Sequence, residues 1–189
     1  MSRWQPNARD RLKQAALELF VEVGFAEATV PQITARAGLT TRTFFRHFAD
    51  KREVLFGGDG LASAIGAAIE AAAPGIPALE AVAHAFDRLG AEVFTRDRRE
   101  LTRRRRAVIA ASPELREREA LKGLSIVAAM TEALRRRGEP EASASVAAEL
   151  AALVLKLAYE RWSEAANQDD FDEVARQALA DVRAVSAAR

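Results

Sequence analysis

The feature that most constrains the fold of this chain is the segment from residue 29 to residue 48. Two short stretches with apolar residues at helical spacing flank Gly38, and glycine is the residue that most readily ends a helix and turns the chain. Thr29 and Thr40 are of the type that caps a helix N-terminus, and Pro31 is tolerated in a first turn. The segment therefore predicts two short helices joined by a tight turn.

Helical signals continue on both sides of this segment. Asn7 and Gly24 are suited to begin and end a first helix, and Asp50 with Glu53 forms a capping-box pattern for a fourth that runs to Phe56. We expect an all-α fold of about nine helices. Beyond the fourth, apolar stripes predict helices near residues 61–73, 78–95, 98–111, 113–137, 141–166 and 170–186.

Three glycines, Gly57, Gly58 and Gly60, interrupt this pattern and indicate a hinge. We therefore expect a small N-terminal domain at residues 1–56 and a larger helical domain at residues 57–189.

Composition argues against several classes of function. The chain has no cysteine, which excludes disulfides, thiolate zinc sites and cysteine nucleophiles. Its two histidines, His47 and His84, form no HExxH-type pair, and no glycine-rich phosphate loop occurs. An enzyme built on a helical bundle would lack candidate catalytic residues, so we expect no enzyme activity, no metal and no cofactor.

Charge and hydropathy indicate the compartment and the partners. Residues 1–56 carry nine Lys or Arg against six Asp or Glu, a net charge of +3, while the remainder carries −2. A modestly basic N-terminal segment suits DNA binding. No uninterrupted apolar run reaches the ~18 residues that cross a bilayer, and the first ten residues lack the apolar core of a signal peptide. We expect a cytoplasmic protein with no membrane partner.

The second short helix predicts how DNA would be read. Its exposed face carries short polar and basic side chains, so it can enter a major groove, with Arg42 forking onto guanine and threonines meeting thymine methyl groups or phosphates. The alternative is an ordinary solvated face. The residues of this face are Thr40, Thr41, Arg42, Thr43 and Arg46.

The same segment resembles the DNA-binding domain of the TetR family. The stretch TVPQITARAGLTTRTFFRHFADKREVL follows the family pattern T-(hydrophobic)-x-x-I-A-x-x-A-G-V-S-x-G-T-(aromatic)-Y-x-H-F-x-x-K-x-x-L, and the preceding LFVEVGFAEATV resembles the end of the family's first helix. The resemblance implies a homodimeric bacterial transcription regulator, with residues 1–56 as its helix-turn-helix DNA-binding domain and residues 57–189 for ligand binding and dimerisation. A small molecule would release such a repressor from operator DNA, and activation is the alternative.

The resemblance also implies roles for particular residues. Thr29 and Thr40 correspond to hydroxyls that cap helices and touch phosphate, and residues 41–43 to base-reading positions. His47 corresponds to a phosphate ligand, although core packing is an equal alternative, and Lys51 is placed to reach the DNA backbone. The implied DNA contacts are Thr29, Thr40, Thr41, Arg42, Thr43, Phe45, Arg46, His47 and Lys51.

Two positions depart from the family pattern. Arg42 stands where the family usually has glycine, which adds a long cation and predicts a changed sequence preference. Phe45 stands where the family usually has tyrosine, so the hydroxyl that bonds phosphate is absent, and we favour ordinary packing for this ring. One lost hydrogen bond costs about 0.5–1.5 kcal/mol, which Arg42 could offset.

The last two helices form a dimer bundle in the TetR family. Residues 141–166 are rich in small side chains that permit close approach, and together with the final helix they are our predicted dimer face. The alternative is that these residues form the core within one protomer. The predicted interface residues are Leu150, Leu153, Leu157, Trp162, Val174, Ala178 and Val182.

The middle helices hold the ligand in this family, and a ligand there would move the fourth helix, which would change the spacing of the two recognition helices. The predicted pocket residues, whose apolar members are equally candidates for plain core, are Phe86, Leu89, Phe94, Arg105, Ile109, Ile126, Met130 and Tyr159.

The run Arg103–Arg106 is either an ion-paired surface or an anchor for phosphate or carboxylate. The stretch LTRRRRAVIAASPELRERE resembles an actinobacterial TetR subgroup that includes the mycofactocin regulator, which implies an acyl-CoA or another lipophilic effector. RNA or membrane-surface binding through the arginines is a rival interpretation.

Overall fold

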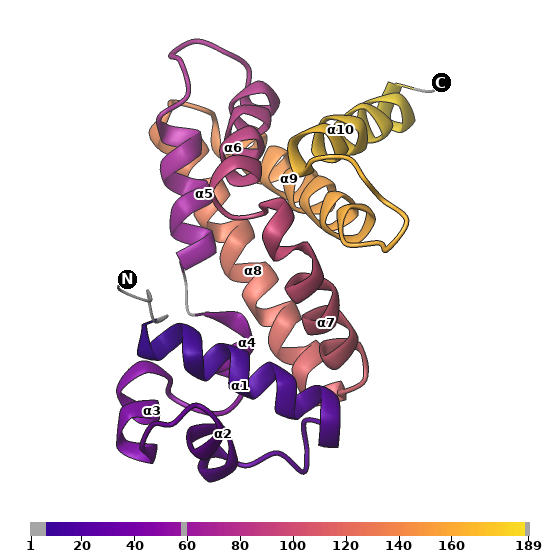
Figure 1. The fold of residues 1–189 in the computed structure, drawn as a ribbon. Helices are drawn as coiled ribbons and strands as arrows, with labels where there is room; N and C mark the ends of the chain where they lie inside the picture. Colours follow the sequence, from indigo (N-terminus) through magenta and orange to yellow (C-terminus); the bar gives the residue numbers. More distant parts are fainter. Residues whose placement is uncertain (1–6, 58–59, 188–189) are drawn as a thin grey trace, which may run out of the picture. The chain divides into compact units, whose positions relative to one another are not determined.

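The computed structural model describes residues 7–57 and 60–187, and all regular structure in these residues is helical (Figure 1). The all-α prediction is confirmed. The elements are α1 (Ala8–Val23), α2 (Val30–Arg36), α3 (Thr41–His47), α4 (Glu53–Phe56), α5 (Gly60–Glu70), α6 (Ala78–Glu92), a 3-10 turn (Arg96–Arg98), α7 (Arg99–Ala110), α8 (Pro113–Arg136), α9 (Glu141–Trp162) and α10 (Phe171–Ala187).

The first three helices begin where the sequence places their caps. The Asn7 side chain accepts a hydrogen bond from the backbone N–H of Asp10 at 3.0 Å. Thr29 forms a complete capping box with Gln32, and the Thr40 hydroxyl accepts from the backbone N–H of Thr43 at 3.2 Å. Each cap satisfies a backbone N–H that a helix start leaves without a partner within the helix.

Helix α4 is shorter than the capping-box pattern predicts. Asp50 Oδ1 accepts from the backbone N–H groups of Arg52 and Glu53 at 2.8 and 3.1 Å, which is one half of the box. The Glu53 carboxylate accepts from Arg118 Nε at 2.7 Å. The helix ends at Gly57, in the left-handed conformation with φ 68°. Gly58 of the predicted hinge lies outside the described residues.

The chain divides into two compact units. The first contains the N-terminal residues up to 58 together with residues 104–120, and the second contains residues 59–103 and 121–189. Residues 104–120 join the first unit because Val108, Ile109 and Leu115 are buried in its core. The sequence predicted that residues 104–120 belong to the second domain, whereas in the structure they belong to the first unit.

In the first unit, α1 packs against α2, α3 and α4 (Figure 1). Phe20 meets Phe25 edge to face at 5.2 Å, so the chain turns back onto the core directly after α1. The apolar side chains of α2, α3 and their flanking residues that this core buries include Ile33, Ala37, Phe44 and Phe48.

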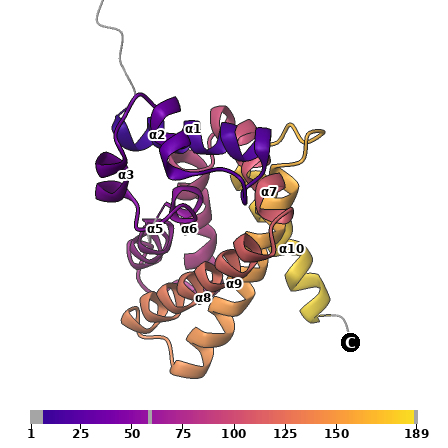
Figure 2. The ribbon, with the colours of Figure 1, turned by 90° about the horizontal axis from the view of Figure 1, so that it is seen from below.

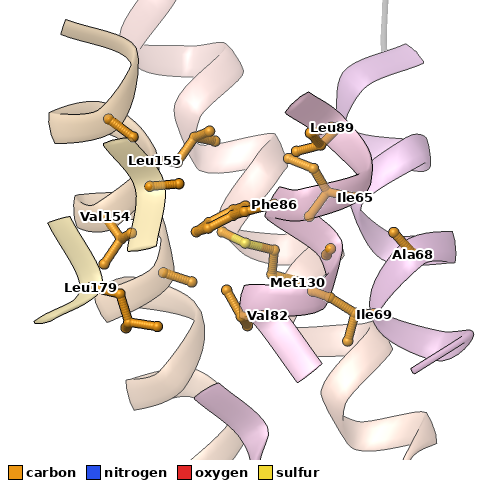
Figure 3. Packing of buried hydrophobic residues seen from close by; sticks show 14 of the residues in the cluster. Ile65, Ala68, Ile69, Val82, Phe86, Leu89, Met130, Val154, Leu155 and Leu179 are labelled. Atoms are coloured by element: carbon orange, nitrogen blue, oxygen red, sulfur yellow. The ribbon is translucent and has the colours of Figure 1, made fainter. Parts of the chain in front are cut away.

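In the second unit, α10 packs against α9, and α5 packs against α6 (Figure 2). Helix α10 also packs against α6. Phe86 and Met130 lie at the centre of its core, between Val154 and Leu155 of α9 on one side and Ile65 of α5 on the other (Figure 3). Such a core contributes about 25 cal/mol for each Å² of apolar surface removed from water.

Helix α9 is the one helix of the described residues that is long and apolar enough to cross a membrane by length and composition. Core helices of soluble proteins meet the same criterion. Eight side chains of α9, including Val154 and Trp162, are buried in the second unit's core, which accounts for its apolar character.

Candidate DNA-binding interface

The turn between α2 and α3 is fixed by backbone and side-chain hydrogen bonds. Gly38 has a φ of 63°, a conformation that costs little only for glycine. The Leu39 N–H donates to the Thr34 carbonyl at 2.8 Å, and Arg11 of α1 donates to the Ala37 carbonyl at 2.5 Å. The orientation of α3 relative to α2 is therefore fixed by a hydrogen bond within the turn and by a second hydrogen bond from α1.

Helix α3 has one buried and one exposed face. Phe44 and Phe48 are buried in the core of the first unit, whereas Thr41, Arg42 and Arg46 are exposed. Residues four apart lie on the same side of a helix, so Arg42 and Arg46 form one basic edge. The exposed face is the one predicted from the sequence.

Most cations of this chain are already bound to its own acceptors. Among the described residues, four cationic side chains make no hydrogen bond or ion pair: Arg42, Arg46, Arg116 and Lys156. Two of these four lie on the exposed edge of α3, and both have their full donor sets available. The net charge of +3 of residues 1–56 therefore does not show which cations are available to a partner. Most cations there are bound within the protein, whereas Arg42 and Arg46 are not.

Phe45 differs from our interpretation of it as an ordinary packing residue. Its ring touches Phe44 edge to face at a centroid distance of 5.3 Å, but 55% of the residue remains exposed. The reason is geometric, because position 45 follows the buried Phe44 by one residue and so points about 100° away from the core. An exposed ring at this place can meet a thymine methyl group.

The threonines of the site divide between capping and exposure. Thr29 and Thr40 cap helices through their hydroxyl groups, and the Thr40 and Thr43 hydroxyls lie 3.0 Å apart. Thr43 is half-buried, while Thr41 is exposed and precedes Arg42. Their predicted contacts with DNA stay predictions.

His47 and Lys51 were both implied as phosphate ligands. His47 is half-buried beside Phe48, and its Nε2 atom is buried without a hydrogen-bond partner in the described residues. Lys51 Nζ donates to the carbonyl oxygens of Phe25, Ala26 and Ala28 at 2.6, 3.3 and 2.8 Å. Burial lowers the pKa of the Lys51 ammonium below its ordinary value. In this conformation Lys51 binds the protein's own backbone instead of projecting toward DNA.

The run Arg103–Arg106 is committed to partners within the protein. Arg103 pairs with Glu100 at 2.6 Å, and neither Arg104 nor Arg106 is free. Arg105 donates to the Leu55 carbonyl at 2.7 Å and stacks over Phe56. The ion-paired interpretation of the run therefore agrees with its contacts.

The predicted ligand-pocket residues fall into different parts of the fold. Phe86, Leu89, Phe94 and Met130 are buried in the second unit's core, and Ile126 and Tyr159 pack against it partly buried. Arg105 and Ile109 instead belong to the first unit. None of the eight lines the surface hollow of about 500 Å³ between α6 and α10, which is lined by Glu80, Ala83, His84, Asp87, Arg176, Leu179, Ala180 and Arg183.

The predicted dimer residues also divide. Trp162, Val174, Ala178 and Val182 are buried within one protomer, so they have almost no surface left to bury against a second copy. Their burial agrees with the intramolecular-core alternative, and their predicted place in a dimer interface stays a prediction. Leu153 is 45% exposed, and Leu150 and Leu157 are half-buried. Val146, four residues before Leu150 on the same side of α9, is 61% exposed and was not among the predicted interface residues.

Two short helices, a glycine turn and free cations on the outer face of the second helix define a helix-turn-helix domain of the DNA-binding class. Residues 12–56 match the family model described as bacterial regulatory proteins, tetR family. Over these residues the chain is therefore similar to the DNA-binding segment of that family.

Individual relatives show the same similarity. The chain is 43% identical over 79 residues to the HTH-type transcriptional regulator TcmR of Streptomyces glaucescens, a match that spans 41% of this chain but 35% of that protein. SmeT of Stenotrophomonas maltophilia, the repressor of a multidrug efflux pump, has a TM-score of 0.59 at 22% identity and covers 94% of this chain and 89% of its own. Thermus thermophilus FadR in complex with lauroyl-CoA has a TM-score of 0.55 at 22% identity and covers 96% of both chains. The fold of nearly the whole chain is thus shared with these two solved proteins.

Proposed function

We propose that this protein is a transcription repressor of the TetR type that binds operator DNA through α3. The observation that carries the proposal is the pair of exposed, unpartnered guanidinium groups of Arg42 and Arg46 on one edge of that helix. Binding that releases counterions from phosphates needs cations that are not already neutralised, and most others in this chain have partners.

We assign different tasks to the two arginines. Arg42 lies in the first turn of α3, the part of a recognition helix that contacts base edges, and its guanidinium can donate two hydrogen bonds to guanine O6 and N7. Arg46 lies in the last turn, where a phosphate is the nearer acceptor. Phe45 and Thr41 add apolar contact to thymine methyl groups.

We propose that the protein acts as a homodimer through α9. Val146, Leu150, Leu153 and Leu157 recur at helical spacing, and each keeps part of its surface exposed in the protomer. A twofold dimer would present two copies of α3 about 34–36 Å apart, which is one turn of DNA.

We propose an apolar small molecule as the effector. SmeT is known in complex with triclosan and FadR in complex with lauroyl-CoA, so this fold accommodates lipophilic compounds. In this chain the residues suited to such a compound are Phe86, Leu89, Phe94, Ile126, Met130 and Tyr159 of the second unit. An acyl-CoA also needs cations for its phosphates, and the arginines of the run Arg103–Arg106 are already bound, which favours an effector without phosphates. We place this activity in the cytoplasm.

The proposal is tested by selecting operator sequences from a random duplex pool with the wild-type protein and with the variant Arg42→Ala. We expect the variant to bind the wild-type site about 1–3 kcal/mol more weakly and to lose preference at one guanine in each half-site. Arg116→Ala, which removes an unpartnered arginine outside α3, is the matched control and should keep both properties. Unchanged affinity and preference in Arg42→Ala would overturn the role of α3, and release by triclosan or lauroyl-CoA would identify the effector class.

A further inference from the structure

Three carbonyl oxygens of the loop between α1 and α2 converge on one ammonium group. Lys51 Nζ lies 2.6 Å from the oxygen of Phe25, 2.8 Å from that of Ala28 and 3.3 Å from that of Ala26. The Phe25 ring lies against the same group, 4.3 Å from Nζ to the ring centroid. An ammonium has three N–H donors, so none remains for a phosphate.

The loop that Lys51 binds leads directly into the DNA-binding segment. It ends at Thr29, which caps α2, and α2 leads through the Gly38 turn into α3. Lys51 itself follows α3 and precedes α4, so its side chain joins the chain after the recognition helix to the chain before α2. The hydrogen bonds of Lys51 therefore connect the two ends of the segment that contains α2 and α3.

A second cation holds the other end of α2. Arg11 of α1 donates to the Ala37 carbonyl at the α2–α3 turn. The carbonyls of a loop and of a helix end repel one another when they point to one place, and a cation removes that repulsion. Lys51 and Arg11 therefore fix both ends of α2, while Arg42 and Arg46 remain available on α3.

We infer that Lys51 is a positioning residue for DNA binding, which sets the place of α2 and α3 by binding the α1–α2 loop, and that it is not a phosphate ligand. The expected effect of Lys51 on DNA binding rests on the proposed function, whereas its expected effect on the α1–α2 loop does not. Lys51 thus acts through α2 and α3, and its loss changes where Arg42 and Arg46 lie.

The test compares Lys51→Met with Arg46→Met, each of which removes one cation and leaves an unbranched apolar side chain. Duplex DNA selected by the wild-type protein is titrated at several salt concentrations, and amide hydrogen exchange is measured in the free proteins. Lys51→Met should weaken binding roughly ten-fold at every salt concentration, the effect of one lost charged hydrogen bond, with an unchanged salt slope. Exchange of residues 24–36 should rise.

Arg46→Met should instead lower the salt slope by about 0.9, as expected for one lost phosphate contact, with unchanged exchange. A slope lowered in the same way by Lys51→Met, with unchanged exchange of residues 24–36, would overturn the inference. Lys51→Arg covers the case in which Lys51→Met does not fold. Its planar guanidinium cannot match three converging carbonyls, so exchange should rise, whereas a phosphate ligand would tolerate the change.

The two hypotheses fail separately. If the wild-type protein selects no DNA, the proposed function is wrong, and the exchange of residues 24–36 in Lys51→Met still decides whether Lys51 positions the loop. Unchanged exchange and an unchanged melting temperature in that variant would refute the positioning role whatever the DNA result.

Discussion

At the scale of single residues, Gly38 controls how α2 meets α3. Its φ of 63° lies in the left-handed region, and a Cβ added there would lie 2.9 Å from Arg11 Nη2. We expect Gly38→Ala to lower the free energy of unfolding by about 1–2 kcal/mol, the cost of a left-handed residue with a side chain, as measured by urea denaturation.

Gly123 offers the matched control for this change. It lies within α8, has nothing within 4 Å of an added Cβ and does not have a positive φ. Gly123→Ala should therefore raise the free energy of unfolding by about 0.5–1 kcal/mol through helix propensity alone. Equal effects of the two substitutions would contradict the role of the turn.

Residue roles were only partly predictable from the sequence. The inward Phe44 and Phe48 follow from helical spacing, because periodicity decides which side of a helix is buried. Lys51 and Arg105 could not be resolved in this way, because their partners are backbone carbonyls of segments far away in the chain. Only the folded backbone determines where such carbonyls converge.

At the scale of elements, the start of α4 depends on one carboxylate. Asp50 accepts from two backbone N–H groups and pairs with Arg52 at 2.6 Å, and the Arg52 guanidinium holds the pKa of Asp50 below its ordinary value. Because this pKa is lower in the folded state, the pair's stabilisation is present above the unfolded-state pKa of about 4 and is lost as pH falls through the folded-state value.

Asp50→Asn isolates the charge, since the amide oxygen can still accept from the backbone. We expect a loss of about 0.5–1 kcal/mol in the free energy of unfolding at pH 7, the size of a partly exposed ion pair. The difference from wild type should shrink as pH falls from 5 to 3, measured by urea denaturation across that range. A difference that stays constant to pH 3 would show that the Asp50 charge makes no contribution.

Local signals explain why most helix starts were predicted, whereas α4 begins later than its capping pattern predicts. A cap such as Thr29 acts on N–H groups two or three residues away, so the sequence contains the whole interaction. Glu53 in the first turn of α4 instead binds Arg118, which lies 65 residues away in the chain. Long-range partners of this kind leave no local pattern.

At the scale of the whole molecule, the proposed dimer depends on the exposed stripe of α9. We expect Leu153→Glu to convert the dimer to monomers in sedimentation equilibrium and to weaken operator binding, because it buries a charge in an apolar contact. Leu124→Glu is the control, since Leu124 is 65% exposed on α8, outside this stripe. A monomeric Leu124→Glu or a dimeric Leu153→Glu would place the interface elsewhere.

The interleaving of the two units has a consequence for exchanging parts between relatives. The DNA-binding unit is discontinuous, because residues 104–120 complete its core with Val108, Ile109 and Leu115. A graft cut at the glycines after α4 would carry α3 but leave behind three apolar side chains that belong to the core of its unit. Transfer of operator specificity to the second unit of a relative therefore requires that both residues 1–58 and residues 104–120 be exchanged. For the same reason, evolution by recombination at a single point would be disfavoured.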